Sequence, residues 1–119
     1  MKAVLEKYVE YVDKQDPSIM EGYFSDRLEG ADPYGSHAGL ATEVLARLAN
    51  VPFHTKKAEQ TGPVRTTIWN KAAVPFKLYA DVDGHAMTID IIDIMTFDQD
   101  GKICKIEAFW GKENVTLIN

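Results

Sequence analysis

The chain has 119 residues and a hydrophobic share of 45%, which predict one folded domain with a substantial core and exclude a disordered chain. Its formal net charge of −5 argues against a nucleic-acid partner, because nucleic-acid binding needs a basic patch. No apolar run approaches the roughly 20 residues that span a bilayer, and charges interrupt the N-terminal stretch where a signal peptide would be apolar. We therefore expect a cytoplasmic protein that has no membrane partner.

A few residue types limit the chemistry further. Cys104 is the one cysteine, which excludes an internal disulfide and fits a reducing compartment. The histidines His37, His54 and His85 are scattered and lack the spacing of metal ligands. We expect no metal site, and the sequence has no phosphate-binding loop pattern.

The first predicted element is an amphipathic helix over Lys2–Lys14. Its apolar stripe is formed by Val4, Leu5, Tyr8 and Val12. Tyr8 lies in the middle of this stripe, so we expect its hydroxyl to enter the interior, where a tyrosine usually needs a hydrogen-bond partner. That partner is either a backbone group of the core or a ligand. Tyr11 lies to one side of the stripe and is the weaker candidate.

A second helix is predicted directly afterwards, with Asp16 as its N-cap and Pro17 at its first position. Its apolar side would be formed by Ile19, Met20, Tyr23 and Phe24. The glycine-rich segment 27–39 is predicted to form turns around short extended pieces. Asp32 precedes Pro33 in this segment, and such a pair commonly forms a turn.

A third helix is predicted over Leu40–Asn50, and Pro52 ends it. The pattern then changes to the two-residue alternation of strands. The expected strands are Lys57–Trp69, interrupted by Gly62-Pro63, then Val74–Val82, Ala86–Phe97 and Lys102–Trp110. Asp83-Gly84 is the signal for a tight hairpin between two of these strands.

The strand over Ala86–Phe97 is the most informative stretch of the chain. One of its faces is formed by Met87, Ile89, Ile91, Asp93, Met95 and Phe97. Asp93 is the one polar group on that face, and a buried carboxylate without a partner tends to take up a proton. A protonated carboxyl group can donate a hydrogen bond inside an apolar pocket. The alternative is that Asp93 pairs with a lysine or arginine from elsewhere in the chain.

Three helices followed by a meander of long strands predict an α+β fold. We expect the three N-terminal helices to pack on a curved, mostly antiparallel sheet and to enclose a cone-shaped pocket. Tyr8, Asp32 and Asp93 are its candidate functional groups. Two acid-type groups in an apolar cavity can donate hydrogen bonds to a carbonyl oxygen, while an ionised carboxylate removes a proton beside that carbonyl. This chemistry would be enolisation without a cofactor.

Several stretches match a known family. They are TGPVR at Thr61–Arg65, VPF at Val74–Phe76, DIIDIMTFDQDGKI at Asp90–Ile103 and AFWGKENV at Ala108–Val115. Looser matches are KYVEYVD at Lys7–Asp13 and ADPYG at Ala31–Gly35. With these stretches the chain resembles the ketosteroid isomerases (steroid Δ-isomerases), in the cone-shaped superfamily of nuclear transport factor 2.

The resemblance implies a role for each candidate group. Asp32 takes the position of the general base, and Tyr8 and protonated Asp93 take the two positions of the oxyanion hole. The implied reaction moves a β,γ double bond of a 3-oxosteroid into conjugation through a dienolate. No cofactor is implied, because the carbonyl of the substrate is the electron sink.

The resemblance also implies an apolar pocket for a steroid-like substrate and a homodimer. The implied pocket lining is Val12, Val74, Phe76, Ile91, Ile106 and Trp110. The dimer would form through the outer face of the sheet, which Ile92, Ile94 and Trp69 would help to cover. Asp90 is expected to face away from the pocket, because strand alternation places it opposite Asp93.

The chain departs from the family in two places. The family backs its oxyanion tyrosine with further tyrosines, whereas here the corresponding position is Phe24 and the third helix contains none. We therefore expect the Tyr8 hydroxyl to act without a tyrosine network. Lys56 is expected to replace an apolar lining residue near the pocket mouth, in a segment, 40–57, that matches poorly. Two alternatives stay open: another cone-fold enzyme, such as a polyketide cyclase, and a non-catalytic binding or dimerisation module.

Overall fold

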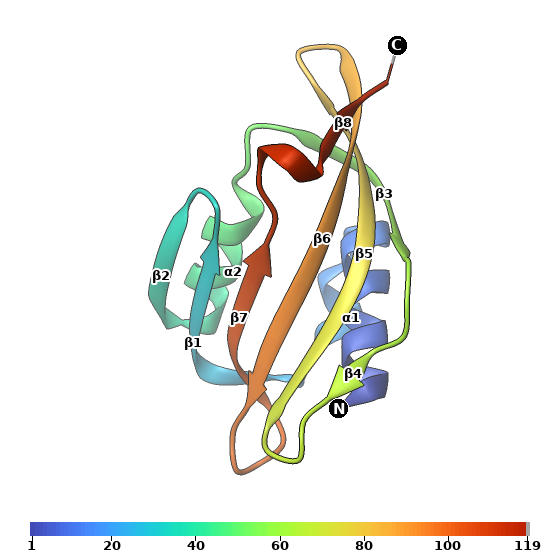
Figure 1. The fold of residues 1–119 in the computed structure, drawn as a ribbon. Helices are drawn as coiled ribbons and strands as arrows, with labels where there is room; N and C mark the ends of the chain where they lie inside the picture. Colours follow the sequence, from blue (N-terminus) through green and yellow to red (C-terminus); the bar gives the residue numbers. More distant parts are fainter. Residues whose placement is uncertain (119) are drawn as a thin grey trace.

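The computed structural model describes residues 1–118, in which two α-helices and two 3-10 helices accompany an eight-stranded sheet (Figure 1). The helices are α1 (Lys2–Lys14), η1 (Pro17–Met20), α2 (Ala41–Ala49) and η2 (Lys112–Asn114). The strands are β1 (Phe24–Asp32), β2 (Gly35–Leu40), β3 (His54–Gln60), β4 (Arg65–Thr66), β5 (Lys71–Val82), β6 (His85–Phe97), β7 (Ile103–Phe109) and β8 (Val115–Leu117).

The sheet runs in the order β2-β1-β7-β6-β5-β3, with β4 paired to β5 and β8 paired to β6. The pair β1–β7 is parallel, and the other pairs in the described chain are antiparallel. Helix α1 packs on β3 and β5, while α2 packs on β1 and β2. Both helices lie behind the sheet in the view of Figure 1, so one face of the sheet is covered and the other is open. The predicted α+β class is confirmed.

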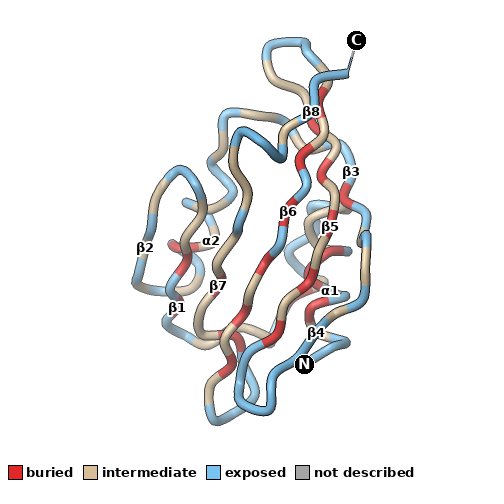
Figure 2. Tube along the Cα trace, in the orientation of Figure 1, coloured by how far each residue is buried: buried red, intermediate tan, exposed pale blue. Residues whose placement is uncertain are grey.

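The hairpin of β5 and β6 forms the centre of the molecule. Its register is continuous from Lys71 opposite Thr96 to Val82 opposite His85. Asp83 and Gly84 connect the strands with φ values of 50° and 79°, as a tight hairpin turn requires. Buried and more exposed residues alternate along both strands (Figure 2). The buried set on β6 is Met87, Ile89, Ile91, Asp93, Met95 and Phe97, as the alternation predicts.

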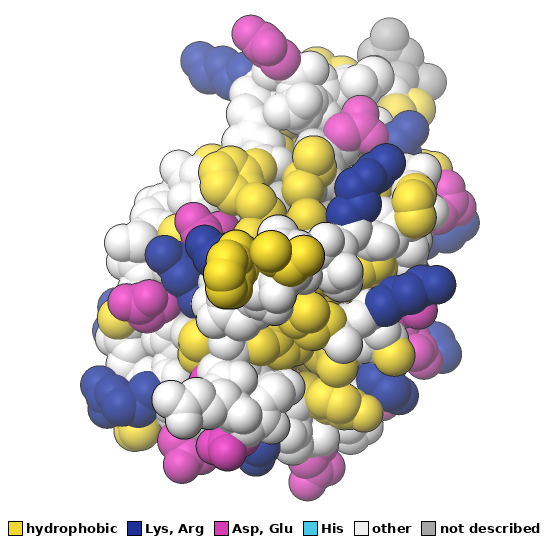
Figure 3. Space-filling view, turned by 60° about the horizontal axis from the view of Figure 1, so that its bottom comes forward, with side chains coloured by type: hydrophobic (Ala, Val, Ile, Leu, Met, Phe, Trp, Pro, Cys, Tyr) yellow, Lys and Arg dark blue, Asp and Glu magenta, His cyan; other side chains and the backbone are white. Residues whose placement is uncertain are grey.

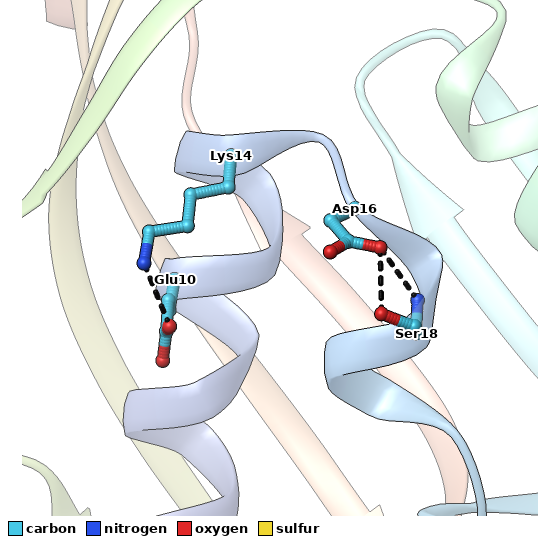
Figure 4. A network of polar contacts seen from close by, with 4 residues as sticks. All are labelled: Glu10, Lys14, Asp16 and Ser18. Carbon is cyan, nitrogen blue, oxygen red and sulfur yellow. Dashed lines mark hydrogen bonds and ion pairs between the residues drawn. The ribbon is translucent and has the colours of Figure 1, made fainter.

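The structure corrects the prediction of a second α-helix. Asp16 does act as a cap, because its Oδ1 accepts hydrogen bonds from the Ser18 backbone N–H (3.0 Å) and the Ser18 hydroxyl (2.7 Å) (Figure 4). However, the helix is a single 3-10 turn that ends at Met20. Gly22 follows with φ 85°, and Phe24 already begins β1 and pairs with Ile103 of β7. Pairing with a strand far along the chain therefore replaces the local helix.

The prediction of three N-terminal helices packed on the sheet is accordingly wrong. Only α1 and α2 are α-helices in the described chain, and the hairpin β1–β2 lies between η1 and α2. The predicted interruption at Gly62-Pro63 is confirmed, since it separates β3 from β4, but β3 begins earlier, at His54. Strand β8 was not predicted. Within residues 1–118 the helices are too short or too polar to cross a membrane.

Candidate active site

A cavity of about 440 Å³ lies between the helices and the covered face of the sheet. This volume is in the range of small-molecule sites, which is roughly 300–1,000 Å³. Its wall combines α1, the hairpin β1–β2, α2, the loop before β3, and strands β5, β6 and β7. Tyr8, Asp32 and Asp93 all line this one cavity. The structure therefore brings together three residues that are far apart in the sequence.

Asp93 is held in the middle of β6, opposite Val74 of β5 and Ala108 of β7. Its side chain is 2% exposed, and its Oδ1 has no hydrogen-bond partner within the described chain. No lysine or arginine of residues 1–118 forms an ion pair with it. Burial, and secondly the charge of Asp32, raise the pKa of Asp93 to about 8. The carboxyl group is therefore mostly protonated at neutral pH and can donate a hydrogen bond.

Tyr8 lies at the centre of α1 and is 9% exposed. Burial raises the pKa of its hydroxyl well above the usual value, and Asp93, Tyr11 and Asp32 raise it further. The hydroxyl therefore stays protonated and is a hydrogen-bond donor. In the part of the chain that the structure describes, it makes no hydrogen bond with another tyrosine. The ring of Tyr11 packs against that of Tyr8 with 5.5 Å between centroids.

Asp32 is the last residue of β1, where the hairpin turns into β2. Its Oδ1 accepts hydrogen bonds from the backbone N–H groups of Tyr34 (2.9 Å) and Gly35 (3.1 Å). The Asp-Pro pair therefore does form a turn, as such pairs commonly do. Oδ2 has no hydrogen-bond partner among residues 1–118, and the half-buried side chain lines the cavity. One oxygen holds the turn while the other is free for a ligand.

Five of the six predicted pocket residues line the cavity. They are Val12, Phe76, Ile91, Ile106 and Trp110. Val74 differs: it is completely buried, beside Asp93 in the β5–β6 ladder, and does not line the cavity. It is directly opposite Asp93 across the ladder, so it supports the site from within the core.

Two surface lysines also bear on the sequence predictions. Lys56 does not line the cavity, because its Nζ lies 2.7 Å from Oδ2 of Asp81 and its side chain is exposed. The expectation that Lys56 sits among the lining residues is therefore wrong. The Nζ of Lys77 lies 4.0 Å from Oδ1 of Asp90. Asp90 is exposed and faces away from the cavity, as predicted.

An aromatic cluster that the sequence did not reveal borders the cavity near Asp32. It consists of Tyr34, Phe53 and Trp110, which come from the β1–β2 turn, the loop before β3 and the end of β7. Their ring centroids are 5.6 Å (Tyr34–Trp110), 6.3 Å (Phe53–Trp110) and 6.5 Å (Tyr34–Phe53) apart. Tyr34 is 55% exposed, so the cluster forms a rim. All three rings lie just outside regular strands, where residue periodicity carries little signal.

Other lining residues were also missed. Leu45, Leu48 and Ala49 of α2 add apolar wall, and Gln15, His54 and Thr55 add polar groups. Tyr11 lines the cavity as well. A signal for this residue was present in the sequence, because it lies three residues after Tyr8 and such positions are neighbours on a helix. Residues 1–118 contain no group of three or more His, Cys, Asp or Glu side chains arranged to hold a metal ion.

Comparison with known proteins agrees with this architecture. A solved structure described as SalBIII, an epoxide hydrolase/cyclase-like enzyme in pyran ring formation in the polyether salinomycin, superimposes with a TM-score of 0.77 at 21% identity. The match covers 98% of this chain and 95% of that chain. The fold is thus α+β with a mixed sheet that does not close, and it fits the cone-shaped fold of the nuclear transport factor 2-like proteins.

The chain is also similar to a protein of Nocardioides simplex named steroid Delta-isomerase. The two are 24% identical over 117 residues, which cover 98% of this chain and 94% of the relative. The resemblance to the steroid isomerases that the sequence motifs indicate is thereby confirmed. No family model matches the chain.

Proposed function

We propose that this protein is a cofactor-free isomerase that moves the β,γ double bond of a 3-oxosteroid into conjugation. The observation that carries the proposal is the meeting of three groups in one apolar cavity: the buried, unpaired carboxyl group of Asp93, the buried hydroxyl of Tyr8 and the half-free carboxylate of Asp32. The full-length similarity to a steroid Delta-isomerase supports it.

The proposed reaction uses the two donors and the base in sequence. The Tyr8 hydroxyl and the Asp93 carboxyl group donate hydrogen bonds to the substrate carbonyl oxygen. Asp32 removes a proton from the carbon between the carbonyl and the double bond, which gives a dienolate and a protonated Asp32. The dienolate then takes the same proton at its far carbon. The carbonyl re-forms, the double bond becomes conjugated, and Asp32 is regenerated.

The environment of each group suits its part. Charge develops on the substrate oxygen beside buried donors in a largely apolar cavity, where hydrogen bonds to that oxygen are strong. Removal of one such donor typically slows an enzyme by about 10²–10³-fold. A positioned general base contributes roughly 10²–10⁴-fold. Asp32 lies at the rim, in a turn held by two backbone N–H groups, which fixes its position without engaging its second oxygen.

The structural neighbour supports a second candidate, an epoxide-opening or ring-forming enzyme. In that reaction the Asp93 carboxyl group would donate a proton to an epoxide oxygen, while Asp32 would remove a proton from the attacking hydroxyl. The same two acidic residues would act, but the substrate would differ. The motif matches on β6 and β7 and the full-length relative favour the isomerase.

We also propose a homodimer through the open face of the sheet. Ile92 and Phe109 face each other there across β6 and β7, and are 47% and 52% exposed. Trp69 is 78% exposed, and hydrophobic side chains gather in the middle of the face shown in Figure 3, with charged ones around them. A patch of this kind marks an interaction surface. Sedimentation that gives the mass of a single chain at micromolar concentration would contradict the dimer.

The decisive experiment for the isomerase is the absorbance of the conjugated enone that forms from a β,γ-unsaturated 3-oxosteroid, measured for the parent and Asp32→Asn. Asparagine keeps an oxygen for the N–H groups of Tyr34 and Gly35, so the turn is preserved while the base is lost. We expect a loss of about 10²–10⁴-fold in kcat. Asp26→Asn, at an exposed position on the same strand, is the matched control and should retain the parent rate.

The outcomes separate the candidate functions. Formation of the enone by the parent and its near loss in Asp32→Asn support the isomerase and its base. No enone with the parent would overturn the steroid assignment. Binding of the steroid without turnover would instead indicate a binding module, and equal rates for the parent and Asp32→Asn would remove Asp32 from the mechanism.

A further inference from the structure

Gly30 is a buried glycine inside β1. Glycine weakens a strand, because it contributes no side chain to the packing and loses more backbone entropy on folding than other residues. The φ of Gly30 lies outside the left-handed region, so the backbone conformation does not require a glycine here. A glycine in such a position often marks a place where another part of the molecule approaches the strand closely.

Helix α2 makes this close approach. It packs on β1, and a Cβ atom placed on Gly30 would lie 2.7 Å from Cδ1 of Leu48 and 3.0 Å from Cγ1 of Val44. Carbon atoms in favourable non-bonded contact lie about 3.5–4.0 Å apart. The side chains of Leu48 and Val44 therefore occupy the space that a side chain at position 30 would need.

The two side chains of α2 differ in the room that they have to move. Val44 is 1% exposed, so the surrounding core holds it in place. Leu48 is half-buried and lines the cavity, and the atoms nearest to Gly30 are the ends of its flexible side chain. A methyl group at position 30 would therefore push the end of Leu48 toward the cavity. The absence of a side chain at Gly30 keeps this part of the cavity open.

This part of the cavity lies beside the proposed base. Gly30 and Asp32 are two residues apart on the same face of β1, which corresponds to about 7 Å along the strand. Ile106 of β7 is paired with Gly30 and also lines the cavity. We call the space bordered by Leu48, Ile106 and Asp32 the α2 lobe. Apart from Asp32 these borders are apolar, so the lobe suits a small apolar group.

We propose that Gly30 is a positioning residue that sets the specificity of the cavity: it keeps Leu48 against β1, so that the α2 lobe accepts a small apolar branch of the substrate. The inference rests on the proposed isomerase function and extends its substrate class to 3-oxosteroids that carry a methyl branch at the relocated double bond. Asp32 returns the proton to the far carbon of the dienolate, so a branch on that carbon lies next to Asp32 and reaches the α2 lobe. Gly30 acts through Leu48 and takes no part in the chemistry.

The test compares two β,γ-unsaturated 3-oxosteroids, one of which carries a methyl group on the carbon that takes back the proton. The ratio of their kcat/KM values, methylated over unsubstituted, is measured for the parent, Gly30→Ala, Leu48→Ala and the double variant. We expect Gly30→Ala to lower this ratio by about tenfold or more, because one methylene-sized difference in an apolar pocket changes discrimination by about 10–200-fold. In the Leu48→Ala background the same change should have a much smaller effect, because the atoms that the new methyl group displaces are gone.

Gly111→Ala is the matched control. A Cβ atom on Gly111 would meet no atom within 4 Å, so the ratio should stay at the value of the parent. A loss of folded protein lowers both kcat/KM values equally, and the ratio therefore reports on the cavity even if a variant is less stable.

A binding measurement keeps this test independent of catalysis. Dissociation constants of the two corresponding conjugated 3-oxosteroids are measured by tryptophan fluorescence for the same variants. Weaker binding of the methylated steroid alone in Gly30→Ala, restored in the double variant, supports the α2 lobe even if the parent catalyses no isomerisation and the proposed function fails. The inference would be overturned if Gly30→Ala left the preference between the two steroids unchanged or shifted it toward the methylated one. Rejection of the methylated steroid by the parent, an equal effect of Gly30→Ala in the Leu48→Ala background, or no binding of either steroid would overturn it as well.

Discussion

The two walls of the cavity are built in different ways. The wall formed by β5 and β6 is regular: its residues alternate between buried and exposed, and its one polar member, Asp93, is 2% exposed. The wall formed by segment 15–55 contains a left-handed residue, a hairpin turn and a loop, and many of its side chains are half-exposed. The regular wall thus holds the group that must be kept away from water, while the irregular wall holds groups that meet the incoming ligand.

The two acidic residues of the site illustrate this difference. Asp93 has no partner for its Oδ1 and is surrounded by apolar side chains of two strands, so its proton is retained. Asp32 accepts two backbone hydrogen bonds in a turn at the rim and stays in reach of the cavity. The same side-chain type is therefore given a donor role on one wall and an acceptor role on the other.

The largest effect is expected for Asp93→Asn, as a change in the pH dependence of stability. The pKa of Asp93 is raised from 3.8 to about 8 by burial, so the folded parent keeps a proton that the unfolded chain releases above pH 4. Its contribution to stability is complete below pH 4 and is lost as the pH rises toward 8. Because asparagine does not titrate, the stability of Asp93→Asn relative to the parent should rise over this window, by at most about 6 kcal/mol.

Urea unfolding at a series of pH values between 4 and 9 measures this difference. Asp90→Asn is the matched control, because Asp90 lies on the same strand but is exposed on the opposite face. Its stability relative to the parent should depend little on pH. If Asp93→Asn and the parent lost stability in parallel as the pH rises, Asp93 would be ionised in the folded protein and could not be the proposed donor.

The regular wall is also the part that could be predicted from the sequence. Strict alternation on β6 placed Asp93 on the apolar face, and the structure buries it there. The Asp83-Gly84 turn fixed the pairing of β5 with β6, so the inward positions of Phe76 and Ile91 followed. Side-chain direction in a long strand depends on the residue number alone, which is why this prediction needed no tertiary information.

The irregular wall could be predicted only in part. The cap at Asp16 was found, but the helix after it does not form, since Phe24 pairs with Ile103 of a strand that lies far along the chain. The turn at Asp32 was also found, yet no local pattern shows that its free oxygen faces the cavity. Lys56 was misplaced because its expected position came from the family resemblance in segment 40–57, which matches poorly, and the register of β3 shifts between Thr55 and Lys57. An irregularity in pairing changes which side chains face inward, and sequence alternation does not reveal it.

A smaller effect is expected from Tyr8→Phe, which removes one donor and keeps the ring. We expect kcat for the enone-forming reaction to fall by about 10²–10³-fold while KM changes little, because the hydrogen bond strengthens only as charge develops on the substrate oxygen. Steady-state absorbance kinetics with the β,γ-unsaturated 3-oxosteroid measure both constants. The remaining donor, Asp93, should sustain the residual rate.

Tyr11→Phe is the matched control for Tyr8→Phe and the smallest change considered. Tyr11 lines the cavity and packs on the Tyr8 ring at 5.5 Å, but its hydroxyl makes no hydrogen bond with residues 1–118. If Tyr8 is the sole phenolic donor, Tyr11→Phe should change kcat by less than about threefold, since only packing with Tyr8 is affected and the ring is kept. Comparable losses in both variants would show that the two tyrosines donate as a pair, and the site would then have a hydroxyl network despite Phe24.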